Sequence, residues 1–208
     1  MTAKTIQKTP ASRRGRKPFA DIDRVLDAAR DCFGRYGVER TKLEDVAAEA
    51  GISRQLLYRI FGTRRSLLDA AINREVEAIV SLQREQMTRY TDFDEAVVEV
   101  SLTGIRLVRE NKIFLELYAG ASATHLPGLL VKPGEPAHEF VLSLWQPTFD
   151  RARKSGELRK DLTDHDLIEW LMAVNYTFIT RDDLTPERQK ELLTLFVIPA
   201  LKPVRRSK

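Results

Sequence analysis

The sequence has a single cysteine, Cys32, so no disulfide can form within this chain. Cys32 lies between Ala29 and Phe33 on an expected apolar helix face, which favours a buried small hydrophobe over a redox sensor. No run of about 18 apolar residues occurs, which excludes a membrane-crossing helix. The basic N-terminus lacks the apolar stretch of a signal peptide, so we expect a cytoplasmic location and no membrane partner.

Residue patterns that carry catalysis are also missing. The three histidines are widely spaced, and no two stand four residues apart on one helix as metal ligands often do. The sequence contains no phosphate-binding loop, nucleophile elbow or dinucleotide-binding glycine motif. Acidic residues gather at 161–166, where they suit the start of a helix, and a metal site is the less favoured interpretation. We therefore expect no catalytic residues, no metal and no cofactor.

The formal net charge of +4 hides a strong asymmetry. Residues 1–18 carry six basic side chains and no acid, and residues 202–208 carry four more, which leaves −6 on residues 19–201. A polyanionic partner would therefore meet the basic ends rather than the whole surface.

Residues 1–20 are polar, basic and interrupted by proline and glycine, and we expect a disordered arm. Its Arg-Arg-Gly-Arg-Lys-Pro stretch resembles an AT-hook core, in which arginine enters the electronegative minor groove of A·T-rich DNA. The candidate minor-groove residues are Arg13, Arg14, Arg16 and Lys17. A solubilising tail explains the arm equally well.

Beyond the arm, apolar residues recur at helical spacing and no segment sustains strand alternation, which predicts an all-α chain. The expected helices begin with one that ends near Gly37, followed by a pair between Thr41 and Phe61. The later expected helices span 64–90, 93–110, 113–123, 137–155, 162–179 and 186–201. A loop containing several prolines and glycines separates the middle two.

The pair of short helices between Thr41 and Phe61 is the most informative part of the sequence. Thr41 and Glu44 fit a capping box, Gly51 is placed to end the first helix, and Ser53 can cap the second. This arrangement is typical of a helix-turn-helix, in which the second helix enters the DNA major groove. An ordinary helical hairpin is the alternative.

The second helix of the pair has an inward face formed by Leu57, Ile60 and Phe61. The side chains left on its other faces are basic or polar: Arg54, Gln55, Tyr58 and Arg59. That division is expected of a helix that packs on a small core and presents its exposed side to a partner.

The last two expected helices have apolar stripes wider than a single core contact requires. Two such helices from each of two subunits would make a four-helix interface, which predicts a homodimer through these helices. Closure of the chain's own core is the alternative.

Aromatic residues concentrate in the middle helices, where they fill a core or line a ligand cavity. Few strongly polar residues accompany them, which favours an apolar or aromatic small-molecule effector. The candidate pocket residues are Phe114, Leu117, Tyr118, Trp145, Phe149, Trp170, Asn175 and Phe178.

Residues 22–72 resemble the TetR family of bacterial transcriptional regulators. The resemblance rests on Phe33, Gly37, Thr41, Asp45-Val46-Ala47, Ala50-Gly51-Ile52-Ser53, Leu57-Tyr58, Phe61, Arg64 and Leu67-Leu68. It implies a three-helix DNA-binding head that contains the helix-turn-helix, and a six-helix C-terminal domain for ligand binding and dimerisation. The expected divisions are an arm at 1–20, a DNA-binding domain at 21–81 with its motif at about 43–62, an effector and dimerisation domain at 82–202, and a basic tail at 203–208.

The resemblance also assigns roles at the DNA. Arg54, Gln55 and Leu56 would face bases, because glutamine pairs with adenine, arginine with guanine, and leucine meets a thymine methyl. Lys42, Tyr58, Arg59 and Arg64 would reach phosphates, and Ser53 completes the expected DNA-binding set. Gln55 and Ile60 depart from the family, which usually has a small residue at the first position and His or Tyr at the second.

The function expected from sequence is therefore a homodimeric repressor, bound to a double-stranded pseudo-palindromic operator and released by a small effector. A sequence-tolerant DNA-binding protein dominated by its basic arm is the alternative. A helical ligand carrier or enzyme is a third and weaker one.

Overall fold

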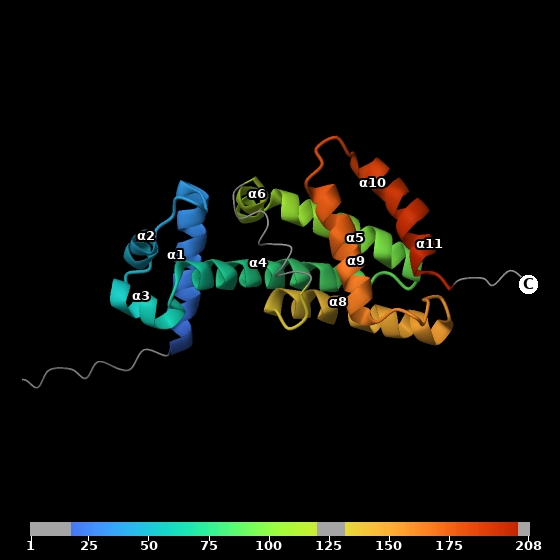
Figure 1. Ribbon diagram of the computed structural model, residues 1–208, viewed down its shortest axis with the longest axis horizontal. Coiled ribbons are helices and arrows are strands. Elements are labelled where there is room, and N and C mark those ends of the chain that lie inside the picture. The colour runs from blue at the N-terminus through green and yellow to red at the C-terminus, as the bar shows by residue number, and fades with distance from the viewer. Residues whose placement is uncertain (1–17, 120–131, 204–208) are drawn as a thin grey trace, which may run out of the picture.

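The computed structural model describes residues 18–119 and 132–203, and side chains within 22–116 and 132–203 (Figure 1). The expected arm up to residue 17, the loop at 120–131 with His125, and the tail at 204–208 lie outside the described residues. Across the described ranges every regular element is helical, which confirms the all-α prediction. No helix there is long and apolar enough to cross a membrane.

The elements follow one another with short connections. They are α1 Pro18–Tyr36, α2 Leu43–Glu49, α3 Arg54–Phe61, α4 Arg64–Met87, α5 Phe93–Glu110, α6 Lys112–Ala119, α8 Pro136–Ser155, α9 Asp164–Ile179, α10 Pro186–Leu192, a π-helical turn Leu193–Val197, and α11 Ile198–Leu201. Helix α1 starts within the expected arm, because Pro18 suits a first helical turn, where its missing amide hydrogen is not needed.

Helix ends agree with local capping chemistry. Asp92 accepts from Glu95 N at 2.8 Å at the start of α5. Thr163 and Asp166 form a capping box, which starts α9 at Asp164 rather than at the expected Leu162. The expected break between the fifth and sixth helices falls at Asn111, as predicted, and its side-chain oxygen accepts from Ile113 N at 3.0 Å.

The molecule has two parts joined by one helix (Figure 1). Helices α1, α2 and α3 form the head, and α5, α6, α8, α9, α10 and α11 form the body. Helix α4 runs from the head into the body, where it packs on α5 and α8. It buries Leu68 beside the head and Val80 within the body, so one continuous helix contributes to both cores.

Candidate functional site

Helices α2 and α3 are joined by a tight turn. Gly51 has a φ of +63°, a conformation that side chains with a Cβ rarely adopt, and its amide donates to Ala48 O at 3.1 Å. Ile52 N donates to Ala47 O at 3.0 Å. The expected role of Gly51 in ending α2 is confirmed, and the turn sets α3 at an angle to α2 (Figure 1).

The predicted capping box at Thr41 and Glu44 is wrong. Thr41 is only 3% exposed, and its hydroxyl donates to Cys32 O at 3.2 Å and Gly37 O at 2.8 Å. The cap of α2 is Lys42, whose amide donates to the Asp45 carboxylate at 3.0 Å. Because Thr41 is drawn into the head core by α1, it holds the loop before the motif instead of the helix start.

Helix α3 is fixed by its cap and by one buried side chain. Ser53 Oγ accepts from Leu56 N at 3.2 Å, which confirms its predicted cap role. Leu57 is fully buried, Phe61 is half-buried against the core, and Ile60 is half-buried. The inward face expected from the sequence is therefore present.

The opposite side of α3 is exposed and polar. Gln55, Tyr58 and Arg59 are exposed, and Leu56 is half-buried. Arg54 forms an ion pair with Glu44 of α2 at 2.8 Å, and its guanidinium carbon lies 5.3 Å from the Tyr58 ring centre. The hydrogen bond to Tyr58 and the charge of Glu44 raise the pKa of Arg54, so it stays a cation. The two helices together hold this cation at the start of α3.

A shallow groove beside α3 gathers further basic groups. Its lining includes Arg40, Lys42, Tyr58 and Arg64, together with the acids Glu39 and Glu44. Arg64 Nε donates to Thr41 O at 2.9 Å, and Arg64 Nη2 donates to Val38 O. Arg64 therefore holds the loop that carries Lys42, while Lys42 itself is exposed.

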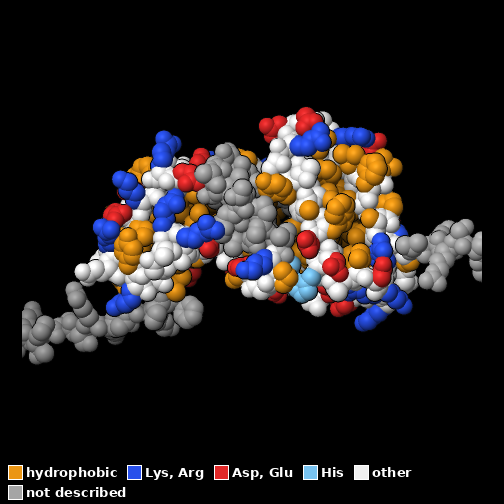
Figure 2. Space-filling model, viewed as in Figure 1, with side chains coloured by type: hydrophobic (Ala, Val, Ile, Leu, Met, Phe, Trp, Pro, Cys, Tyr) orange, Lys and Arg blue, Asp and Glu red, His pale blue; other side chains and the backbone are white. Residues whose placement is uncertain are grey.

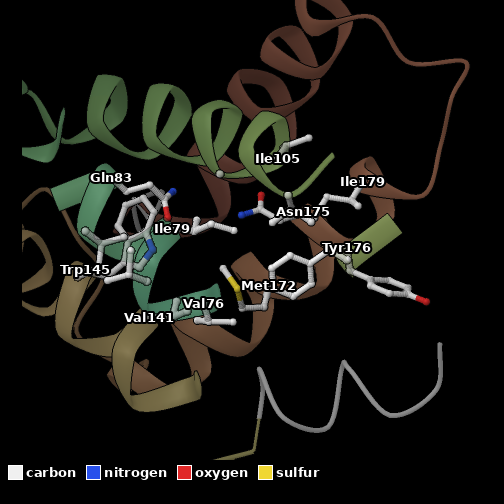
Figure 3. Close-up of a pocket in the computed structure, with 15 residues that line it drawn as sticks. Val76, Ile79, Gln83, Ile105, Val141, Trp145, Met172, Asn175, Tyr176 and Ile179 are labelled. Atoms are coloured by element: carbon white, nitrogen blue, oxygen red, sulfur yellow. The ribbon is translucent and has the colours of Figure 1, made fainter. Parts of the chain in front are cut away.

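The body contains a small apolar cavity of about 70 Å³ between α4, α5, α8 and α9, with Phe114 of α6 also in its wall (Figure 3). Apolar side chains from all four helices line it, including Val76, Ile105 and Trp145. Two amides also reach it: Gln83 from α4 and Asn175 from α9. No charged side chain is found among the described residues that line it.

The two amides are held differently. Gln83 Nε2 donates to Val100 O at 2.9 Å, and a Cβ on Gly104 would stand 2.7 Å from that nitrogen, so this glycine makes room for the amide. Asn175 is only 8% exposed, and its Oδ1 has no hydrogen-bond partner among the described residues. Figure 3 shows the Asn175 amide turned toward the middle of the lining residues.

Only some of the candidate pocket residues line the cavity. Phe114, Trp145 and Asn175 line the cavity. Phe149 and Phe178 are buried without lining it, and Trp170 is 49% exposed on the surface of α9. The side chains of Leu117 and Tyr118 lie outside the described residues. Gln83 was not expected there, although a polar residue within the apolar stripe of α4 is a signal that could have indicated it.

A histidine pair was also missed. His138 of α8 is fully buried, and its Nε2 lies 2.9 Å from His165 Nδ1 at the start of α9. Within the part of the chain that is described, no group of three or more metal-ligating side chains occurs. The two residues are 27 positions apart, so no local spacing could reveal the pair.

Exposed apolar side chains occur on the last helices of the body. Trp170 of α9 is 49% exposed, and Leu195 and Phe196 of the π-helical turn are 55% and 66% exposed. Figure 2 shows hydrophobic side chains gathered over the region of α9, α10 and α11. Such a patch on a globular protein marks a surface that binds a partner.

The capped, exposed α3 set against α2 defines a helix-turn-helix DNA-binding protein. A family model described as bacterial regulatory proteins, tetR family, matches residues 25–71. The Bacillus subtilis HTH-type transcriptional regulator YezE is 32% identical over 154 residues, which cover 72% of this chain and 79% of YezE. The chain belongs to the TetR family and is a helix-turn-helix transcriptional regulator.

Solved structures share the whole fold. The TetR-family repressor AlkX from Dietzia sp. matches with a TM-score of 0.62 and 21% identity, over 86% of this chain and 94% of AlkX. RolR in complex with resorcinol matches with a TM-score of 0.66 and 15% identity, over 89% of each chain. At these identities the likeness concerns the arrangement of the helices.

Proposed function

We propose that this regulator is a homodimeric repressor, which binds a pseudo-palindromic operator and is released when a small molecule enters the body cavity. The observation that carries the proposal is the path of α4. Its first turns pack against the head, and Val76, Ile79, Val80 and Gln83 of the same helix line the cavity. A ligand that binds one arrangement of α4 better than another would shift the head between DNA-bound and released states.

At the operator, the exposed residues of α3 would meet the bases. Gln55 can pair with adenine, Arg54 with guanine, and Leu56 can contact a thymine methyl. Lys42, Tyr58 and Arg59, which are exposed, would reach phosphates and so fix the register without reading sequence. Ser53 would keep its cap role at the helix start, and Arg64 would act by holding the loop of Lys42.

Selection of random duplexes against the full chain tests operator binding. An enriched inverted repeat, with half-sites one DNA turn or a multiple apart, is expected of a two-fold dimer. Gln55→Ala should relax preference at one base pair by about 1–3 kcal/mol, whereas Arg59→Ala should weaken all sequences alike and reduce the salt dependence. If Gln55→Ala weakens binding to all sequences equally, Gln55 does not read a base.

The arm-dominated alternative has one observation in its favour, the six basic side chains and absence of acids in residues 1–18. Deleting residues 1–17 leaves α1 intact and separates the two cases. Loss of most affinity with unchanged sequence preference would support the alternative. Retention of tight, selective binding supports the operator-specific repressor.

Homodimerisation through α9 and the last helical segment is supported by the exposed Trp170, Leu195 and Phe196. Phe196→Glu should shift the molar mass in light scattering from dimer to monomer, because a charge would enter an apolar interface. Leu82→Glu is the matched control, since Leu82 is 54% exposed on α4. A dimer that survives Phe196→Glu contradicts this interface.

The sign of regulation is tested separately. In a reporter whose promoter contains the selected operator, the protein is expected to lower transcription. A rise in transcription would make it an activator.

A further inference from the structure

We infer that the body cavity recognises a small neutral molecule, apolar except for a hydroxyl group that hydrogen-bonds to Asn175. The inference rests on the proposed function only in taking this cavity as the effector site. The chemical class follows from the lining itself.

The Asn175 amide in the cavity wall is not fully hydrogen-bonded within the described part of the chain. Asn175 is more than nine-tenths buried, and among the described residues its Oδ1 has no partner. An unpaired buried acceptor costs free energy that a ligand donor can recover. Because a hydroxyl both donates and accepts, it can serve the oxygen and the nitrogen of this amide alike.

The described lining of the cavity carries no charged side chain. The described lining residues are apolar or aromatic apart from the two amides, and Gln83 already donates to Val100 O. Among the described lining residues, a carboxylate or ammonium would find no ion-pair partner to offset its lost hydration. The lining therefore selects a neutral molecule.

The volume of the cavity limits the size of the ligand. The cavity of about 70 Å³ is smaller than the roughly 150 Å³ cavity that accommodates benzene in an engineered protein core. A single ring can enter only if the walls give way. Met172 supplies such a wall, since its unbranched side chain adapts to irregular space, and Figure 3 shows it close to Val76 of α4. A ligand of one ring would therefore enter only by displacing part of the wall, to which α4 contributes.

Phenol and toluene provide the test, because they match in shape and differ in the hydroxyl. Trp170→Phe leaves Trp145, in the cavity wall, as the only tryptophan of the chain, so its emission reports binding. Phenol is expected to bind about tenfold tighter than toluene, the effect of satisfying one buried acceptor. Benzoate is expected to bind at least about tenfold more weakly than phenol.

Asn175→Leu in the same background should abolish the preference if toluene binding is unchanged, or reverse it if toluene binds more tightly, because phenol is weakened about tenfold. Met172→Leu is the matched control on the same helix, and it should change phenol and toluene affinity alike. Circular dichroism melting shows that each variant is folded. Asn175→Ser, which replaces the amide by a hydroxyl that can still accept a hydrogen bond, should retain more of the phenol preference than Asn175→Leu.

Three results would overturn the inference: equal affinity for phenol and toluene, phenol binding indifferent to Asn175→Leu, or no response to millimolar phenol. Operator release is measured apart from binding. Phenol that binds through Asn175 without releasing DNA would refute the repressor mechanism and leave the ligand class standing.

Discussion

The head and the body each bury a polar side chain, and the two side chains differ in whether the protein satisfies them. In the head, the Thr41 hydroxyl is buried and donates to two backbone carbonyls. In the body, Asn175 Oδ1 and Ser101 Oγ are buried without a partner among the described residues. Thr41 is thus satisfied within the head, whereas Asn175 leaves the body an interaction that a bound molecule can complete.

The largest expected effect is the loss of a head core side chain. Leu57 is fully buried on the inner face of α3, so Leu57→Ala should lower the free energy of unfolding by about 2–5 kcal/mol. Urea unfolding measures it. Leu82→Ala, at an exposed leucine of α4, should change the same quantity by less than about 0.5 kcal/mol. Similar losses in the two variants would contradict the assignment of Leu57 to the core.

The second-largest effect is expected from removing a hydrogen-bonded polar group from the head. Thr41→Val keeps the side-chain shape but leaves Cys32 O without the hydroxyl, so we expect a loss of about 1–3 kcal/mol in unfolding free energy. Thr88→Val is the control, because the Thr88 hydroxyl donates to Glu85 O at an exposed position. A Thr41→Val protein as stable as its parent would show that the head does not depend on this contact.

The same kind of change in the body should have the opposite sign. Asn175→Leu removes an acceptor that has no partner and adds apolar contact, so the unfolding free energy should rise by about 1 kcal/mol. Thermal melting without ligand measures it. A clear loss of stability would mean that the Asn175 amide is satisfied in solution, and the contrast between head and body would fail.

The smallest effect concerns the body surface. The Arg159 guanidinium donates to Asp161 and lowers the pKa of that carboxyl from 3.8 to about 2. The stabilisation from this pair is present above the unfolded pKa and is lost as pH falls toward the folded one. A carboxyl titration by NMR should find Asp161 near its lowered value, and Arg159→Gln should return it toward 3.8. An unchanged pKa in that variant would exclude Arg159 as the cause.

The head could be predicted from sequence because its signals are local. Gly51 and Ser53 act on residues within one helical turn, and Leu57 follows from the spacing of α3. The failure at Thr41 has a physical cause, since a contact with Cys32 from another helix took precedence over the local capping pattern. A local capping pattern mispredicts a side chain that is buried and hydrogen-bonds to another helix instead.

The cavity could be predicted only in part. Its wall combines Gln83, Gly104 and Asn175 from three helices, and no sequence spacing links them. The concentration of aromatic residues correctly predicted Trp145 as a cavity residue, but it also predicted Trp170, which is exposed. An aromatic stripe alone does not distinguish a cavity wall from an exposed face. Buried amides on otherwise apolar stripes are the more specific signal.

Helix α4 has a mechanical consequence, because it is continuous from the head to the cavity. At about 1.5 Å per residue, Gln83 lies about 28 Å along the axis from Arg64. A tilt of about 5° at the cavity end would then displace the other end by about 2.5 Å. In the proposed mechanism α4 acts as a lever that carries α3, so a ring-sized ligand near Gln83 would need to rotate α4 only slightly to move α3 out of register with the DNA groove.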